Sequence, residues 1–123
     1  MVFCSAPVAR RRPRATFGSV ASAYVALLLI HLHFPEAESL KAKRKDLSSV
    51  KAQLHTRMGV AVSEVGGQDT WQRSELAAAL TSGSLAQLQR ATDRVEDWLL
   101  DRFPDGVRVE RSLTSFEEAG GIG

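Results

Sequence analysis

Apolar residues along the first half of the chain change from a continuous run to a helical spacing. Residues 24–34 are apolar on both faces and are followed by Pro35, which is typical of a central strand. A helix over about residues 39–57 is predicted next, with Ser39 as its N-cap and Gly59 just beyond its end. Its apolar residues recur at intervals of three, four and seven: Leu40, Leu47, Val50, Leu54 and Met58.

The second half repeats this change of period. A short β-branched strand over residues 60–65 is followed by the turn Gly66-Gly67, and then by a third strand over roughly 71–81. Ser82-Gly83-Ser84 is expected to end this strand and to cap a second helix, which ends near the turn at residues 104–106, before a fourth strand that starts at Val107. The residues expected to form this helix's apolar side are Leu85, Leu88, Thr92, Val95, Leu99 and Phe103, with Trp98 beside them.

The order of these elements is β-α-β-β-α-β, which predicts an α+β fold of the ferredoxin-like type. Two right-handed crossovers place both helices on one face of a four-stranded antiparallel sheet, with the first and third strands in the middle. We expect residues 24–116 to form this single domain. Residues 117–123 are expected to be a flexible C-terminal tail, and residues 1–23 a disordered N-terminal tail.

The N-terminal tail is rich in arginine. Four of the sixteen basic residues lie in the first 23 positions, which contain no acidic residue, so the rest of the chain has a slight acidic excess. Basic residues followed by an apolar run are also the pattern of a secretory signal. However, no small-residue cleavage site follows residue 32, and removing this run would remove a strand. We therefore expect this run to be a strand and not an export signal or a membrane span, and the single cysteine, Cys4, permits a reducing cytoplasm.

The sheet face without helices, here called the open face, separates several classes of function. Alternation along the first strand directs Leu28, Ile30 and Leu32 toward the helices. It directs Leu27, Leu29, His31 and His33 to the open face, where Ala61, Ser63, Glu75, Ala77, Ala79, Arg108 and Glu110 join them. No aromatic residue belongs to this set, which disfavours the base stacking of an RNA recognition motif. Such a surface suits pairing with a second copy, or burial under the N-terminal tail.

Charged and polar residues form two candidate binding segments. The first helix has a basic start, Lys41, Lys43, Arg44 and Lys45, which is typical either of a phosphate-contacting patch or of a solvated helix face. The connection between the second and third strands offers hydrogen-bonding groups and one indole ring: Gln68, Asp69, Trp71, Gln72 and Arg73. Asp69 and Arg73 could equally brace this hairpin as a surface ion pair.

Catalytic and metal-binding patterns are weak. His31 and His33 lie on one face of a strand, but no third ligand is evident, and Glu75 and Glu110 are only possible neighbours. No nucleophile motif is present, and Gly66-Gly67 is not followed by the residues of a phosphate-binding loop. We therefore expect no catalytic residue, no metal and no cofactor.

Three segments resemble one family. Ser39-Leu40-Lys41-Ala42-Lys43-Arg44, residues 64–73 (EVGGQDTWQR) and residues 80–83 (LTSG) are similar to motifs of the YlxP-like bacterial proteins. The resemblance implies a ferredoxin-like fold, a cytoplasmic location and no established catalytic residue. Genes of this family often neighbour those of a translation initiation factor and ribosome-binding factor A. The basic N-terminal tail departs from the family, whose members usually begin near the first strand.

Two hypotheses follow. The first is a non-enzymatic accessory protein that contacts RNA or a ribosome-associated partner through the two candidate segments. The alternative is a homo-oligomeric structural or small-molecule-sensing domain that pairs through the open face. An enzyme with a site around His31 and His33 is a third and weaker reading.

Overall fold

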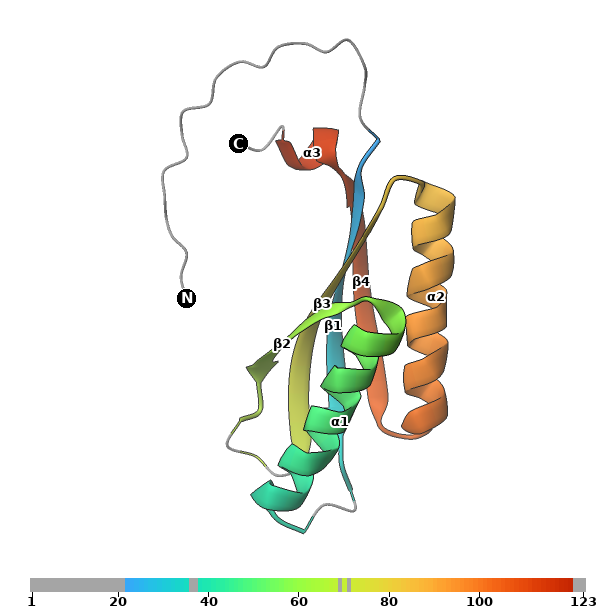
Figure 1. Ribbon diagram of the computed structural model, residues 1–123. Coiled ribbons are helices and arrows are strands. Elements are labelled where there is room, and N and C mark those ends of the chain that lie inside the picture. Colours follow the sequence, from blue (N-terminus) through green and yellow to red (C-terminus); the bar gives the residue numbers. More distant parts are fainter. Residues whose placement is uncertain (1–21, 36–37, 69, 71, 121–123) are drawn as a thin grey trace.

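The computed structural model describes residues 22–35, 38–68, 70 and 72–120, and its first six elements have the predicted order (Figure 1). The sheet order is β2-β3-β1-β4, and each neighbouring pair is antiparallel. The predicted ferredoxin-like α+β fold is therefore confirmed, with the first and third strands in the middle. The elements are β1 (Tyr24–His33), α1 (Leu40–Met58), β2 (Ala61–Gly66), β3 (Arg73–Ser82), α2 (Leu85–Arg102), β4 (Val107–Ser115) and α3 (Phe116–Gly120).

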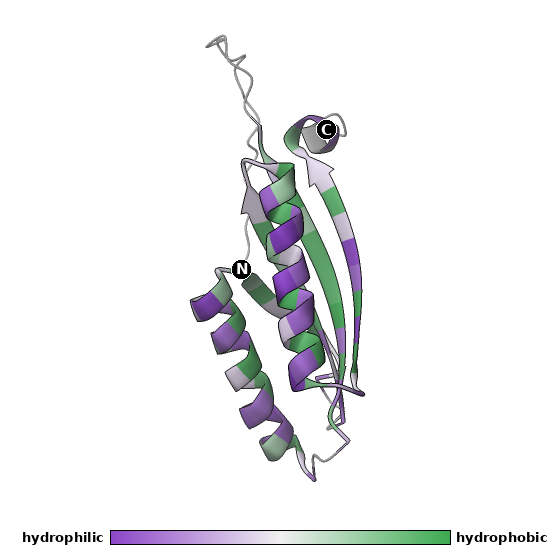
Figure 2. Ribbon diagram, turned by 90° about the vertical axis from the view of Figure 1, so that its right-hand side faces the viewer, coloured by the Kyte–Doolittle hydropathy of each residue, from purple (hydrophilic) through white to green (hydrophobic). Residues whose placement is uncertain are grey.

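The hydrophobic core lies between the sheet and helices α1 and α2. Leu28, Ile30 and Leu32 of β1 are each at most 3% exposed, so the predicted orientation of this strand is right. The helices contribute one apolar face each to the same core, formed by Leu47, Val50, Leu54, Leu88, Val95 and Leu99. Figure 2 shows the contrast between the hydrophobic central strands and the largely hydrophilic outer sides of the two helices.

The helix ends follow the sequence signals. The Ser39 hydroxyl accepts a hydrogen bond from the Ala42 amide at 3.1 Å, and the Ser84 hydroxyl accepts one from the Gln87 amide at 3.3 Å. Gly59 ends α1 in a left-handed conformation with φ of 66°, which glycine adopts without steric cost. The predicted caps are thus confirmed. Leu40 and Leu85 were expected in the apolar faces, but as the first helical residues they are 41% and 42% exposed.

A short helix that the sequence patterns did not indicate, α3, is formed by residues 116–120 at the start of the C-terminal segment. Ser115 and Glu118 make a reciprocal capping box. The Ser115 hydroxyl accepts from the Glu118 amide, and the Glu118 carboxylate accepts from the Ser115 amide, both at 3.2 Å. The Phe116 amide also donates to the Ala23 carbonyl at 2.8 Å. The predicted N-terminal tail lies outside the described residues, apart from Ser22 and Ala23.

An ion-pair cluster attaches the edge strand β4 to α2. Arg111 Nη2 lies 2.9 Å from Asp93 Oδ1 and 2.7 Å from Glu96 Oε1. The hydrogen bond with Glu96 is the main cause that raises the pKa of Arg111 above its ordinary value. Arg111 therefore helps to fix one edge of the sheet against the helix layer.

Within the described part of the chain, neither long helix is apolar enough over a sufficient length to cross a bilayer.

Candidate functional site

A buried lysine joins the start of α1 to the loop between β2 and β3. The Lys43 side chain is fully buried, and its ammonium group donates to the carbonyl oxygens of Gly67 and Thr70, the latter at 2.6 Å. The expectation that Lys43 contacts phosphate is therefore corrected. At helical spacing, position 43 lies on the same face as Leu47, Val50 and Leu54, so its side chain points inward and not to solvent.

The other three cations at the start of α1 are exposed. Lys41 and Lys45 are four residues apart, so they lie on one side of the helix, and both are exposed. The Arg44 side chain is 52% exposed and lies 3.4 Å from Glu64 Oε1 on β2. The first turn of α1 contains no acidic residue, so these cations add to the positive end of the helix dipole.

The predicted hairpin residues are divided by the structure. Gln68 is exposed and lies in the loop that Lys43 holds against α1. Gln72 is half-buried, and its carbonyl accepts from the Phe34 amide at 2.8 Å. Arg73 is exposed on the open face opposite His33, so it does not share a surface with Lys41 and Lys45. Asp69 and Trp71 lie outside the described residues. We call Lys41, Arg44, Lys45 and Gln68 the basic end.

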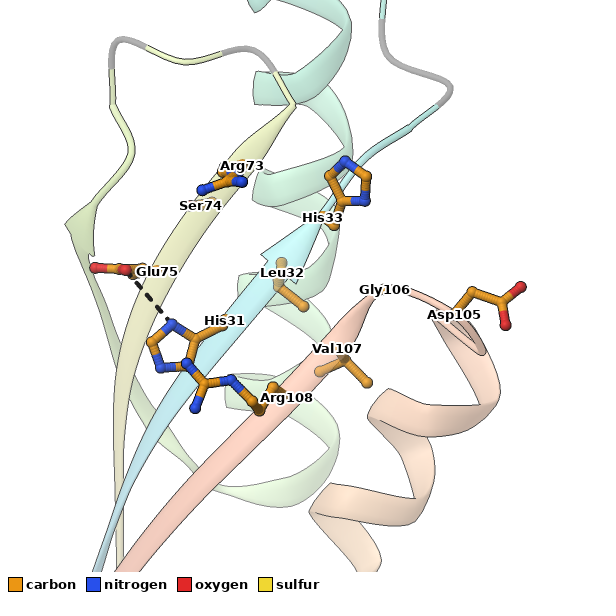
Figure 3. A pocket seen from close by; sticks show the side chains of 10 residues that line it. All are labelled: His31, Leu32, His33, Arg73, Ser74, Glu75, Asp105, Gly106, Val107 and Arg108. Carbon is orange, nitrogen blue, oxygen red and sulfur yellow. Dashed lines mark ion pairs between the residues drawn. The ribbon is translucent and has the colours of Figure 1, made fainter.

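A second polar site occupies the open face near the ends of β1 and β3 (Figure 3). It is a hollow of about 470 Å³, and its lining includes the charged and imidazole side chains of His31, His33, Arg73, Glu75, Asp105 and Arg108. His31 lies between two carboxylates, with Nδ1 at 3.4 Å from Glu75 Oε2 and Nε2 at 2.7 Å from Glu110 Oε2. Arg108 Nη1 lies 3.4 Å from the same Glu110 oxygen.

The polar side chains of this cluster contact one another. Each ring nitrogen of His31 faces a carboxylate, Glu75 on one side and Glu110 on the other. The arrangement follows from register, because Glu75 and Arg108 are the cross-strand neighbours of His31 on the two sides. Among the described residues, no group of three or more His, Cys, Asp or Glu is arranged to hold a metal ion. These contacts form a row of polar side chains that crosses β3, β1 and β4.

A smaller hollow of about 260 Å³, which the sequence patterns did not indicate, lies between the end of β1 and the end of α2. Its walls include Phe34 and Phe103, whose rings meet edge to face with centroids 5.6 Å apart. The Arg102 guanidinium lies over the Phe103 ring at 5.6 Å. Phe34 and Phe103 are far apart in the sequence and meet through the packing of α2 against the sheet. No local sequence pattern therefore indicates this hollow.

The fold and these surfaces define a small ferredoxin-like α+β protein with a basic end and a sheet face that no helix of the described residues covers. The chain belongs to the family described as Protein of unknown function (DUF503), whose model matches residues 25–111. It is 37% identical over 82 residues to the uncharacterized protein YlxP of Bacillus subtilis (strain 168), an alignment that covers 67% of this chain and 85% of that relative. The resemblance inferred from the motifs is therefore confirmed.

Solved structures add evidence on the fold. The de novo designed protein Foldit4 matches with a TM-score of 0.52 at 12% sequence identity. The match covers 75% of this chain and 96% of the designed protein. At this identity the likeness concerns the backbone arrangement alone.

Proposed function

We propose that this protein is a non-catalytic accessory factor that contacts RNA through its basic end, in the cytoplasm and near the ribosome. The observation that carries this proposal is the group of three exposed cations, Lys41, Arg44 and Lys45, on the first two turns of α1. Phosphate groups are the natural partners of such a cluster, because each contact releases counterions from the nucleic acid. The genomic association of the YlxP-like family supports the choice of ribosomal RNA or its particles.

The anchoring of the neighbouring loop supports the same proposal. Lys43 donates to the carbonyl oxygens of Gly67 and Thr70, so the exposed amide of Gln68 lies at the same end as the cations. Cations would position the phosphate backbone, and a side-chain amide could bind a base edge or a sugar hydroxyl. The non-catalytic part of the proposal follows from the sequence, in which no nucleophile or metal-ligand pattern is evident.

The test is the salt dependence of RNA binding. Fluorescence anisotropy with a labelled single-stranded RNA would be measured between about 50 and 200 mM salt, with a duplex RNA as a second probe. Three phosphate contacts on a single strand predict a slope of log K against log salt of about −2 per bound chain. Replacing Lys41 and Lys45 by alanine is expected to reduce that slope by about 1.4.

The matched control removes the same charge elsewhere. Arg57 at the end of α1 and Arg90 on α2 are exposed, and their double alanine variant should keep most of the slope. Equal slopes for the two double variants would contradict the proposal, as would the absence of salt-dependent binding by the unmodified chain. Co-sedimentation with ribosomal particles, with and without nuclease, would then separate an RNA partner from a protein partner.

A further inference from the structure

The centre of the open face has a ridge beside a trough. On β1, Leu27 and Leu29 point to this face, and Leu27 is 52% exposed although it lies mid-strand. Directly across on β3, Ala79 is paired with Leu27 and Ala77 with Leu29. The two leucines of β1 therefore form the ridge, and the two alanines of β3 form the trough beside it. A hollow of about 400 Å³ lies over this region.

We propose that the open face binds a second copy of this chain. The two copies are related by a two-fold axis that lies outside the open face, parallel to the strands and over the line between β1 and β3. Rotation by 180° about this axis exchanges the two central strands and keeps each residue at its level along them. Leu27 of each copy then faces Ala79 of the other, and Leu29 faces Ala77. The leucine ridge of one sheet fills the alanine trough of the other, as in aligned packing of two sheets about 10 Å apart.

The charges on this face fit the same axis. His31 and Glu75 are cross-strand neighbours, so the rotation brings His31 of each copy over Glu75 of the other. By symmetry this complementary contact occurs twice. It lies one level beyond Leu29, at the edge of the apolar centre, where charged groups belong in an interface. Arg73 and His33 lie further out, at the exposed rim of the face.

This complementarity favours a second copy over a nucleic acid on this surface. Stacking platforms for bases need aromatic side chains, and the described residues of the open face include none beyond the imidazoles of His31 and His33. Both signs of charge occur at its polar end, where Glu75 and Arg108 lie on the two sides of His31 on the neighbouring strands. A surface that carries both signs of charge suits contact with its own copy.

The experiment compares two leucines of nearly equal exposure. Leu27 on the open face is 52% exposed and Leu100 on α2 is 51% exposed, so Leu27→Glu and Leu100→Glu make the same change on different surfaces. Sedimentation velocity of the full chain would be measured from about 1 to 300 μM, a range suited to interfaces of micromolar affinity. Circular dichroism melting would check that both variants remain folded.

The unmodified chain and L100E are expected to be dimers at the upper concentrations. L27E is expected to dissociate at least about 100-fold more readily, because each dimer would bury two unpaired carboxylates against the alanine trough. A chain that stays monomeric over the whole range would overturn the proposal. A dimer that L100E weakens as much as L27E, or that L27E leaves intact, would equally overturn it.

Discussion

Lys43 provides the sharpest test of how this fold holds its basic end together. The change Lys43→Met removes the ammonium group and keeps most of the aliphatic stem, so it isolates the polar contacts from the packing. At least two backbone carbonyls, those of Gly67 and Thr70, lose a charged donor. Both acceptors lie in the loop between β2 and β3, more than twenty residues along the chain from Lys43.

Two opposing effects set the magnitude. Each buried carbonyl without a donor costs about 1–3 kcal/mol. Removing a buried ammonium also removes the cost of taking that charge out of water, which returns part of this loss. We expect a net decrease in the free energy of unfolding of about 2 kcal/mol, since the loop can open and hydrate its carbonyls. For a domain of this size the melting temperature should fall by on the order of 10 °C.

The assay is chemical denaturation of K43M combined with amide hydrogen exchange. Faster exchange in the loop after β2 than in the core strands would show that the loop is released first. The matched control is Lys45→Met, because Lys45 is exposed and the change should be within about 0.5 kcal/mol of neutral. K43M should also preserve the salt slope of RNA binding, since Lys43 is not one of the exposed cations. A K43M variant as stable as K45M, with unchanged loop exchange, would refute the assignment of Lys43 as a tether.

Two further predictions concern the edges of the fold. Gly106→Ala should lower stability by about 1–3 kcal/mol, because an added Cβ would lie 2.7 Å from the His33 carbonyl oxygen. Gly83→Ala is the control and should be close to neutral, since the nearest atom to an added Cβ there is at 3.5 Å. Equal melting temperatures for the two variants would show that the backbone relaxes. Arg111→Met should lower the free energy of unfolding by about 1 kcal/mol at low salt and by less at high salt, as measured by denaturant titration. Arg108→Met is the control and should change it little, because that side chain is 68% exposed. A decrease for Arg111→Met that does not depend on salt would point to packing instead of charge.

Much of the fold was predictable because strand and helix periods are strong local signals. The alternation in β1 gave the buried set directly. Ser39, Gly59 and the segment Ser82-Gly83-Ser84 marked three helix ends that the structure confirms. Helix α3 also had a local signal, since Ser115 and Glu118 have the spacing of a capping box. It was missed because a five-residue helix has too few apolar positions to show a period.

The candidate site was less predictable, since it depends on contacts between distant segments. Composition does not distinguish Lys43 from Lys41, although the spacing of Lys43 from Leu47 and Val50 places it on the buried face. Its acceptors belong to a loop whose position relative to α1 is fixed only by the packed fold. The placement of His31 between Glu75 and Glu110 likewise requires the register of two strand pairings, which the sequence does not state.

The two proposals are geometrically compatible. The basic end lies at the start of α1, in the helix layer, whereas the proposed dimer covers the opposite face of the sheet. A two-fold axis along the strands keeps each level of one copy beside the same level of the other, so both basic ends would emerge at the same end of the dimer. An RNA that spans them would gain a second set of phosphate contacts without a new site in the chain, and the second contact would be effectively intramolecular. Pairing through the open face would therefore strengthen RNA binding without taking part in it.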